Sequence, residues 1–308
     1  MPSRRSFLAF TVGCVALGAS ACGGGGDGGA SVATNDDEIT VASFSFPESV
    51  MLAELYSQAL EAHGFGVKRT FGLGPREFVA PALEQGLVEL VPEYAGSAAT
   101  FFSLGAARPT RDPAETHATL VDALDGEDIV ALDGAPAQNA NTFVVTAETA
   151  DEYELTELSE LRPLAPDLRF GGPPECPTRP LCLAGLEQRY DLEFDRFVTV
   201  DAGGPLTHQA LRSGAIDVGL LFTSDPAITS EGLVELVDDL GLQPAENVTP
   251  LIHRAVLQRW GPDVAAAVDA VSAALTTAEL RALNAAIATD DADPAAVAAE
   301  WLRDKGLT

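Results

Sequence analysis

The chain has 308 residues, of which 46 are Asp or Glu and 18 are Lys or Arg, so its formal net charge is −28 at pH 7. A surface with so large an excess of negative charge repels polyphosphates, which excludes nucleic acid as a partner. If residues 1–21 are removed as an export signal, 287 residues remain (308 minus 21), which is enough for two lobes that each bury a core.

The N-terminus has the pattern of an export signal of the twin-arginine type. Arg4 and Arg5 precede an apolar run from Leu8 to Ala21. This run is shorter than the roughly 20 apolar residues that span a bilayer, so we expect the chain to be exported rather than embedded.

A lipobox follows the apolar run. In Ala19-Ser20-Ala21-Cys22 the small residues admit a signal peptidase, and Cys22 would become the lipidated first residue of the mature protein. An ordinary cleaved signal with a chance cysteine is the alternative. Residues 22–37 are rich in glycine and poor in large apolar side chains, so we expect a flexible tether between the lipid and the folded domain.

Strands and helices are predicted to alternate along the rest of the chain, which favours an α/β fold with parallel sheets. In such sheets ligands meet the carboxyl ends of the strands. Phe44 and Tyr94 both fall at such ends. The predicted strands are 39–44, 67–71, 88–91, 141–145, 168–170, 197–200 and 215–222, and the predicted helices are 45–63, 77–85, 183–190 and 207–214.

Three helix starts carry capping signals. Ser45 and Glu48 have the spacing of a capping box, as do Thr276 and Glu279. Asp293 precedes a proline and is expected to cap the last helix.

Two cysteines remain outside the export signal and the lipobox, Cys176 and Cys182. In an oxidising compartment we expect them to form a disulfide, which would hold the loop that carries Arg179 in one shape. A metal site is the alternative, but no His or second Cys pair lies nearby to complete a tetrahedral zinc shell.

Several segments together resemble one family. They are Pro92-Glu93-Tyr94-Ala95-Gly96 at a strand end, Arg179 through Tyr190, Thr207 through Asp225, and Asn247 through Ile252. The resemblance is to osmoprotectant-binding proteins, the glycine betaine, choline and carnitine receptors of ABC importers. It implies a two-lobed periplasmic-binding-protein-like fold of type II, with two crossovers and a ligand cleft between the lobes. Lobe 1 would comprise 39–143 plus 246–308, and lobe 2 would comprise 144–245.

The resemblance also implies a binding site. In this family aromatic rings hold a quaternary ammonium by cation–π attraction, and polar donors meet the ligand's carboxylate. The implied ligand-binding residues are Phe44, Tyr94, Ser97, Asn141, Phe143, Arg179, His208, Phe222 and Thr223. Phe44 stands where the family often has lysine, and Phe143, His208 and Phe222 stand where it has tyrosines. Core packing is the alternative for each Phe, and a less polar solute is the alternative ligand.

The motifs of common enzymes are absent from the sequence: G-x-S-x-G, H-E-x-x-H and G-x-x-x-x-G-K do not occur, and the four histidines are widely scattered. We therefore expect no catalysis, no cofactor and no metal. The sequence predicts a monomeric receptor, anchored through Cys22 to the outer face of the cell membrane, that delivers its solute to ABC permease subunits and their ATPase. An exported sensor with the same fold is the alternative.

Overall fold

The computed structural model describes residues 37–288 and 292–308. The predicted export signal, the lipobox at Cys22 and nearly all of the predicted tether lie outside these residues. Within the described ranges, none of the helices has the length and apolar character needed to cross a bilayer.

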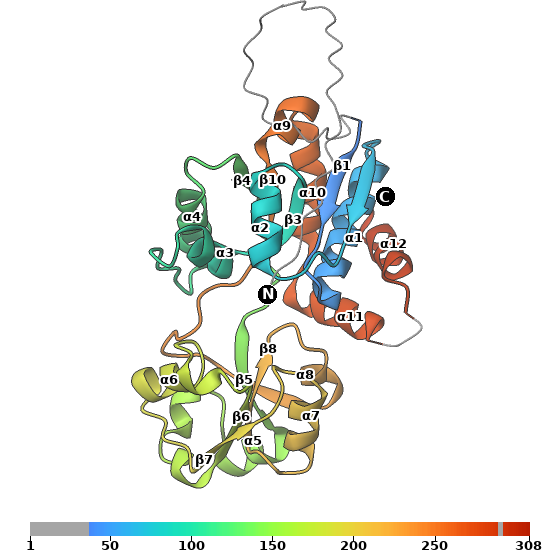
Figure 1. Cartoon of the computed structure of the whole chain (residues 1–308). Coiled ribbons are helices and arrows are strands. Elements are labelled where there is room, and N and C mark those ends of the chain that lie inside the picture. The colour runs from blue at the N-terminus through green and yellow to red at the C-terminus, as the bar shows by residue number, and fades with distance from the viewer. Residues whose placement is uncertain (1–36, 289–291) are drawn as a thin grey trace, which may run out of the picture. The chain divides into compact units, whose positions relative to one another are not determined.

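The first lobe is built on a five-stranded sheet in the order β2-β1-β3-β10-β4 (Figure 1). Strand β1 is parallel to β2 and β3, whereas β10 is antiparallel to β3 and β4. The strands are β1 (Ile39–Ala42), β2 (Val67–Thr70), β3 (Leu90–Tyr94), β4 (Ile129–Ala131) and β10 (Val248–His253). The helices of this lobe are α1 (Pro47–Ala62), α2 (Arg76–Glu84), α3 (Ala95–Phe102), α4 (Pro113–Ala123), α9 (Arg254–Trp260), α10 (Pro262–Ala274), α11 (Thr277–Ile287) and α12 (Pro294–Lys305).

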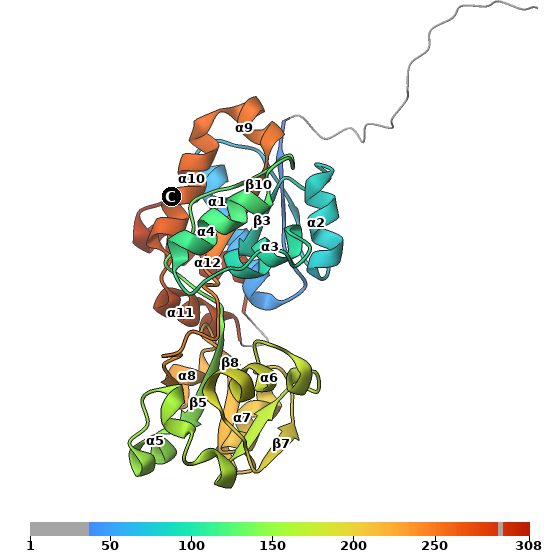
Figure 2. The ribbon, with the colours of Figure 1, turned by 90° about the vertical axis from the view of Figure 1, so that its left-hand side faces the viewer.

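The second lobe is built on a sheet in the order β7-β6-β8-β5-β9. Figure 2 shows its strands β5, β7 and β8 together with the helices of this lobe. Strand β6 is parallel to β7 and β8, and β5 is antiparallel to β8 and β9. The strands are β5 (Asn141–Thr146), β6 (Arg169–Gly172), β7 (Arg196–Thr199), β8 (Val218–Phe222) and β9 (Leu233–Leu236). The α-helices are α5 (Ala147–Tyr153), α6 (Leu183–Gly185), α7 (Pro205–Arg212) and α8 (Ala227–Ser230), and a π-helical turn, Leu186–Tyr190, continues α6.

Strand β5 of the second sheet is buried on both faces. Phe143 and Val145 belong to one apolar cluster with Leu186, while Val144 between them belongs to another with Leu211. Because successive strand residues point to opposite faces, the middle of β5 has apolar side chains at three consecutive positions. The same holds for β8, where Leu220 and Leu221 belong to the two different clusters.

Most of the predicted elements are confirmed, and the fold is the predicted two-lobed α/β fold. The prediction of parallel sheets holds for the pairs of β1 and of β6, and it is wrong for β10 and β5, which run antiparallel to the strands they pair with. Both strands lie at the crossovers. The boundary predicted between 143 and 144 falls inside β5, all of which pairs with the second sheet, so that lobe begins at Asn141.

The capping predictions have mixed outcomes. Thr276 accepts a hydrogen bond from the Glu279 backbone N–H, and Asp293 accepts one from Ala295. The capping box at the first helix is wrong: Phe46 occupies the N-cap position and makes no side-chain cap bond. Glu48 instead turns inward, as described below.

Candidate functional site

A cavity of about 910 Å³ is lined by residues of both lobes and of the 241–246 connection. Ser97 and Phe101 line it from the first lobe, and Arg179 and Phe222 line it from the second. Parallel β1 and β3 end at one edge of their sheet, and α3 begins directly after β3, so one end of this helix reaches the cavity.

The α3 wall consists of Gly96, Ser97, Thr100 and Phe101. Their spacing places them on neighbouring turns of one helix face. Phe101 was not predicted as a site residue, although its position four residues after Ser97 is a signal that could have found it.

Gly96 lets the second crossover approach α3 closely. A Cβ atom built on Gly96 would lie 2.9 Å from the Ala245 carbonyl oxygen and 3.2 Å from the Glu246 carboxyl carbon. Ser97 then donates two hydrogen bonds to Glu246, from its Oγ (2.7 Å) and its backbone N–H (3.0 Å). Glu246 was not predicted either. Burial raises the pKa of its carboxyl to about 7, against the opposite effect of the two Ser97 donors.

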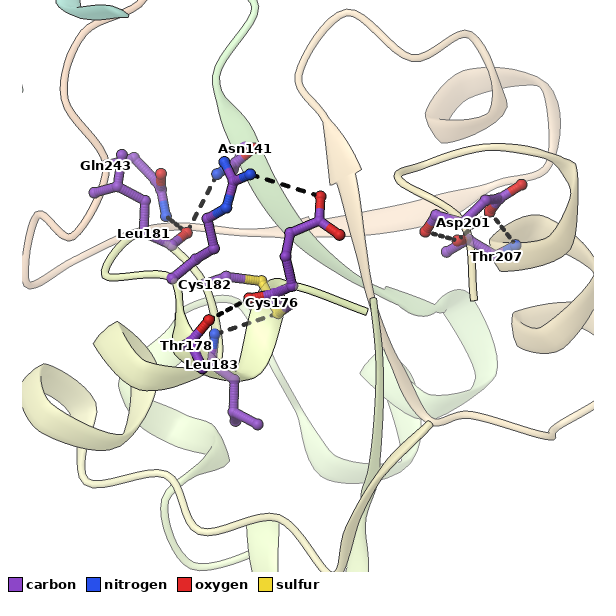
Figure 3. The surroundings of a disulfide bond; sticks show 11 residues. Asn141, Cys176, Thr178, Leu181, Cys182, Leu183, Asp201, Thr207 and Gln243 are labelled. Atoms are coloured by element: carbon purple, nitrogen blue, oxygen red, sulfur yellow. Dashed lines mark hydrogen bonds and ion pairs between the residues drawn. A yellow bond between two sulfur atoms is a disulfide. The ribbon is translucent and has the colours of Figure 1, made fainter. Parts of the chain in front are cut away.

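The disulfide between Cys176 and Cys182 is confirmed, with the two Cα atoms 5.2 Å apart (Figure 3). The disulfide closes a loop that contains Leu181. The Leu181 carbonyl oxygen accepts hydrogen bonds from Asn141 Nδ2 (3.2 Å) and Gln243 Nε2 (2.9 Å), which also hold this loop in place. Asn141 also lines the cavity, so one side chain both borders the cavity and anchors this loop.

Arg179 projects from the disulfide loop at the cavity wall. Its side chain is 66% exposed, and its Nη2 lies 3.8 Å from a Glu175 carboxylate oxygen. An exposed guanidinium with a weak ion pair remains free to take up an anionic group in its bidentate geometry.

Four arginines line the cavity, in a chain that is otherwise strongly acidic. Arg76 is neutralised by Glu93, which it contacts through two hydrogen bonds of 2.7 and 2.9 Å. The other three are Arg108, Arg111 and Arg179. Only Arg179 was predicted. These three arginines outnumber the two acids that also line the cavity, Glu175 and Glu246, so a carboxylate could find a positive partner there.

Phe44 and Tyr94 do not line the cavity. Both rings stack on Phe46: the centroids of Phe44 and Phe46 lie 5.7 Å apart, and those of Phe46 and Tyr94 lie 6.3 Å apart. Both are nearly fully buried and pack next to the α3 wall, and their contact with ligand stays a prediction.

The Tyr94 hydroxyl belongs to a buried network around Glu48. It donates to Glu48 Oε1 at 2.5 Å, while Asn139 and Asn284 donate to the two carboxylate oxygens at 2.6 Å each. Burial and the adjacent Glu48 raise the pKa of Tyr94 well above its usual value. Asn284 also donates to the Ser224 carbonyl of the second lobe, so the network links both lobes.

Three other residues that were predicted to contact the ligand are not among the residues that line the cavity. Phe143 is 1% exposed and packs against Phe170, so it is a core residue, as expected for a strand buried on both faces. His208 contacts Asp225 at 3.0 Å, and it does not line the cavity. Thr223 accepts from the Ala140 N–H and donates to the Gln138 carbonyl, which fixes the first crossover to β8.

Of the predicted site residues, Ser97, Asn141, Arg179 and Phe222 are brought together around the cavity. Phe222 stands at the end of β8 and Phe101 on α3, so each lobe contributes one ring. Across the part of the chain that the structure describes, no group of three or more His, Cys, Asp or Glu side chains could hold a metal ion.

Two α/β lobes that share a cavity at their strand ends define a solute-binding protein of the type II periplasmic class. The chain belongs to the family of substrate-binding domains of ABC-type glycine betaine transport systems, whose profile matches residues 37–304. Substrate-binding proteins of ABC importers work outside the cytoplasm, and the relatives of this chain are transport proteins rather than enzymes.

Two relatives and one solved structure illustrate the similarity. The chain is 28% identical to the glycine betaine-binding protein YehZ of Escherichia coli (strain K12) over 275 residues, covering 85% of this chain and 88% of that one. It is 26% identical to a glycine-betaine-binding protein of Pseudomonas aeruginosa, with 88% and 89% covered. A crystal structure described as a glycine betaine/carnitine/choline ABC transporter superposes with a TM-score of 0.80 at 23% identity, covering 87% of this chain and 99% of that one.

Proposed function

We propose that this protein captures a small quaternary-ammonium solute, such as glycine betaine, choline or carnitine, and delivers it to an ABC permease. The observation that carries the proposal is the cavity walled by both lobes, in a chain of this family. The proteins it resembles include two named for binding glycine betaine.

The chemistry of the cavity wall supports this ligand class. A quaternary ammonium cannot donate hydrogen bonds, so ring faces such as those of Phe101 and Phe222 suit it through cation–π attraction. In a zwitterionic betaine the carboxylate would lie towards Arg179, whose guanidinium can bind it through two parallel hydrogen bonds. The solute would therefore span the two lobes, which is how binding would favour their closure.

The proposal includes an anchor and the absence of catalysis. Export through the N-terminal signal and lipidation of Cys22 would hold a monomeric receptor at the outer face of the membrane, next to its permease. A receptor returns its ligand unchanged. The separation of the described residues into two lobes, at Asn141 and near Glu246, is the arrangement that a hinged receptor needs.

Calorimetry on the fragment 37–308 tests the proposal. We expect glycine betaine, choline or carnitine to bind with one site per chain, and the ligand recovered afterwards to be chemically intact. Saturating ligand at a hundred times its Kd should raise the free energy of unfolding by about 2.7 kcal/mol. Absence of binding and of stabilisation by all three compounds would refute the proposed ligand class, and a chemically altered ligand would point to an enzyme.

A further inference from the structure

Glu246 is a buried acid in the wall of the cavity. It is 7% exposed, and it lines the cavity from the second crossover, at the point where that segment meets α3. Among residues 37–288 and 292–308, no Lys, Arg or His forms an ion pair with its carboxylate. Burying an acid without a counter-charge is costly, so a cation that entered the cavity would relieve that cost.

The groups that face Glu246 hold it in place without neutralising it. Ser97, on α3, donates to both carboxylate oxygens. The positive charge of Arg76, on α2, acts on Glu246, but the Arg76 guanidinium is bound to Glu93 on β3, which in turn repels Glu246. Gly96 leaves room for the carboxyl group 3.2 Å from the position that a Cβ would take.

We propose that Glu246 supplies the negative charge that faces the cationic head of the bound solute, and that it thereby selects quaternary ammonium compounds over neutral solutes. This inference rests on the proposed function, because it assigns a specificity-determining residue to the same site. Ring faces attract a cation and also accept neutral apolar groups. A carboxylate adds discrimination that rings alone do not provide.

The role has a signature in the pH dependence of binding. Since burial raises the pKa of Glu246 to about 7, a large part of the population is protonated at neutral pH. A cation binds the ionised form better, so binding near pH 7 should release a proton. If only the ionised form binds, affinity should rise by about tenfold between pH 6 and pH 8, because the ionised fraction rises from about 0.1 to about 0.9.

The test is calorimetry of choline with fragment 37–308 and its Glu246→Gln variant at pH 6, 7 and 8, in two buffers of different ionisation enthalpy. Choline is the probe because it has no titrating group in this range. We expect proton release and a tenfold gain in affinity for the wild type. Glu246→Gln should bind choline at least tenfold more weakly at pH 8 and show neither effect. Glu148→Gln, which removes an exposed acid on α5, is the matched control and should behave as the wild type.

Ser97→Ala is the second variant, for the case that Glu246→Gln does not fold. It removes a donor that favours the ionised carboxyl, so the rise in choline affinity should move to higher pH. The inference is overturned if choline binds the wild type without proton release, if affinity falls as the pH rises, or if both variants keep the wild-type profile. Failure of the proposed function would look different, since the wild type would then bind none of the quaternary compounds at any pH.

Discussion

Replacing Tyr94 with Phe should destabilise the protein while leaving solute affinity unchanged. The hydroxyl donates to Glu48 Oε1 at 2.5 Å, and Glu48 is itself 7% exposed. A hydrogen bond to a charged group contributes about 1.5–3 kcal/mol, and the lost donor leaves a buried carboxylate oxygen with only Asn139 as its partner. We therefore expect the free energy of unfolding to fall by about 1.5–3 kcal/mol. Affinity should stay within about twofold, because Tyr94 does not line the cavity.

Urea unfolding of fragment 37–308, analysed by linear extrapolation, measures the first effect, and calorimetry with the tightest-binding quaternary compound measures the second. Tyr153→Phe is the control, since its side chain is exposed on α5 and should change stability by less than about 0.5 kcal/mol. Equal stability of the two variants would refute the role assigned to the Glu48 network. A large loss of affinity in Tyr94→Phe would instead show that the hydroxyl reaches the ligand.

Three further outcomes are expected. Replacing Cys176 and Cys182 with serine should lower the free energy of unfolding by about 2 kcal/mol, because the closed loop is short, and urea unfolding with and without reductant would reveal it. Arg179→Ala should weaken glycine betaine tenfold or more and choline much less, since only the former has a carboxylate; equal losses in calorimetry would contradict this. The Asp225 contact raises the pKa of His208. The stability that the pair provides should therefore be present at low pH and lost as the pH rises through the folded-state pKa of His208. The free energy of unfolding of His208→Gln should then differ less from that of the wild type at pH 8.5 than at pH 5.5.

The strand ends could be predicted from the sequence because they depend on local patterns. The apolar run from Ile39 and the proline-bounded run to Tyr94 mark the parallel strands β1 and β3, and α3, which follows β3, forms part of the cavity wall. The disulfide could be predicted because only two cysteines follow the predicted lipobox. By contrast, nothing local distinguishes a ring in a cavity from a ring in a core. Phe143 and Phe222 end up in these two different environments, although each lies in an apolar strand.

Glu48 shows that the spacing of a capping box can be present in the sequence without the capping box forming in the structure. Its position three residues after Ser45 fits a capping box, yet its carboxylate is bound by Tyr94 from β3 and by Asn139 and Asn284, which are 91 and 236 residues away in the chain. A cap contributes about 1 kcal/mol, whereas three donors to one buried carboxylate contribute more. Long-range partners therefore decided the orientation of this side chain, and a sequence motif holds no information about them.

Glu246 extends the same reasoning to the binding site. It lies between Ala245 and Asn247, in a polar segment that by itself is typical of an exposed connection, and its partner Ser97 is 149 residues away. The arginines of the cavity also come from separate segments. A protein with a net charge of −28 attracts cations at long range, so steering alone would favour choline over a zwitterion. The Arg179 side of the cavity counters this bias and gives a carboxylate a place to bind, while Glu246 retains the preference for a cationic head. If both assignments hold, the double variant Arg179→Ala and Glu246→Gln should lose most of its discrimination between charged and neutral solutes in competition calorimetry, and a double variant that still prefers glycine betaine would show that the rings alone set the specificity.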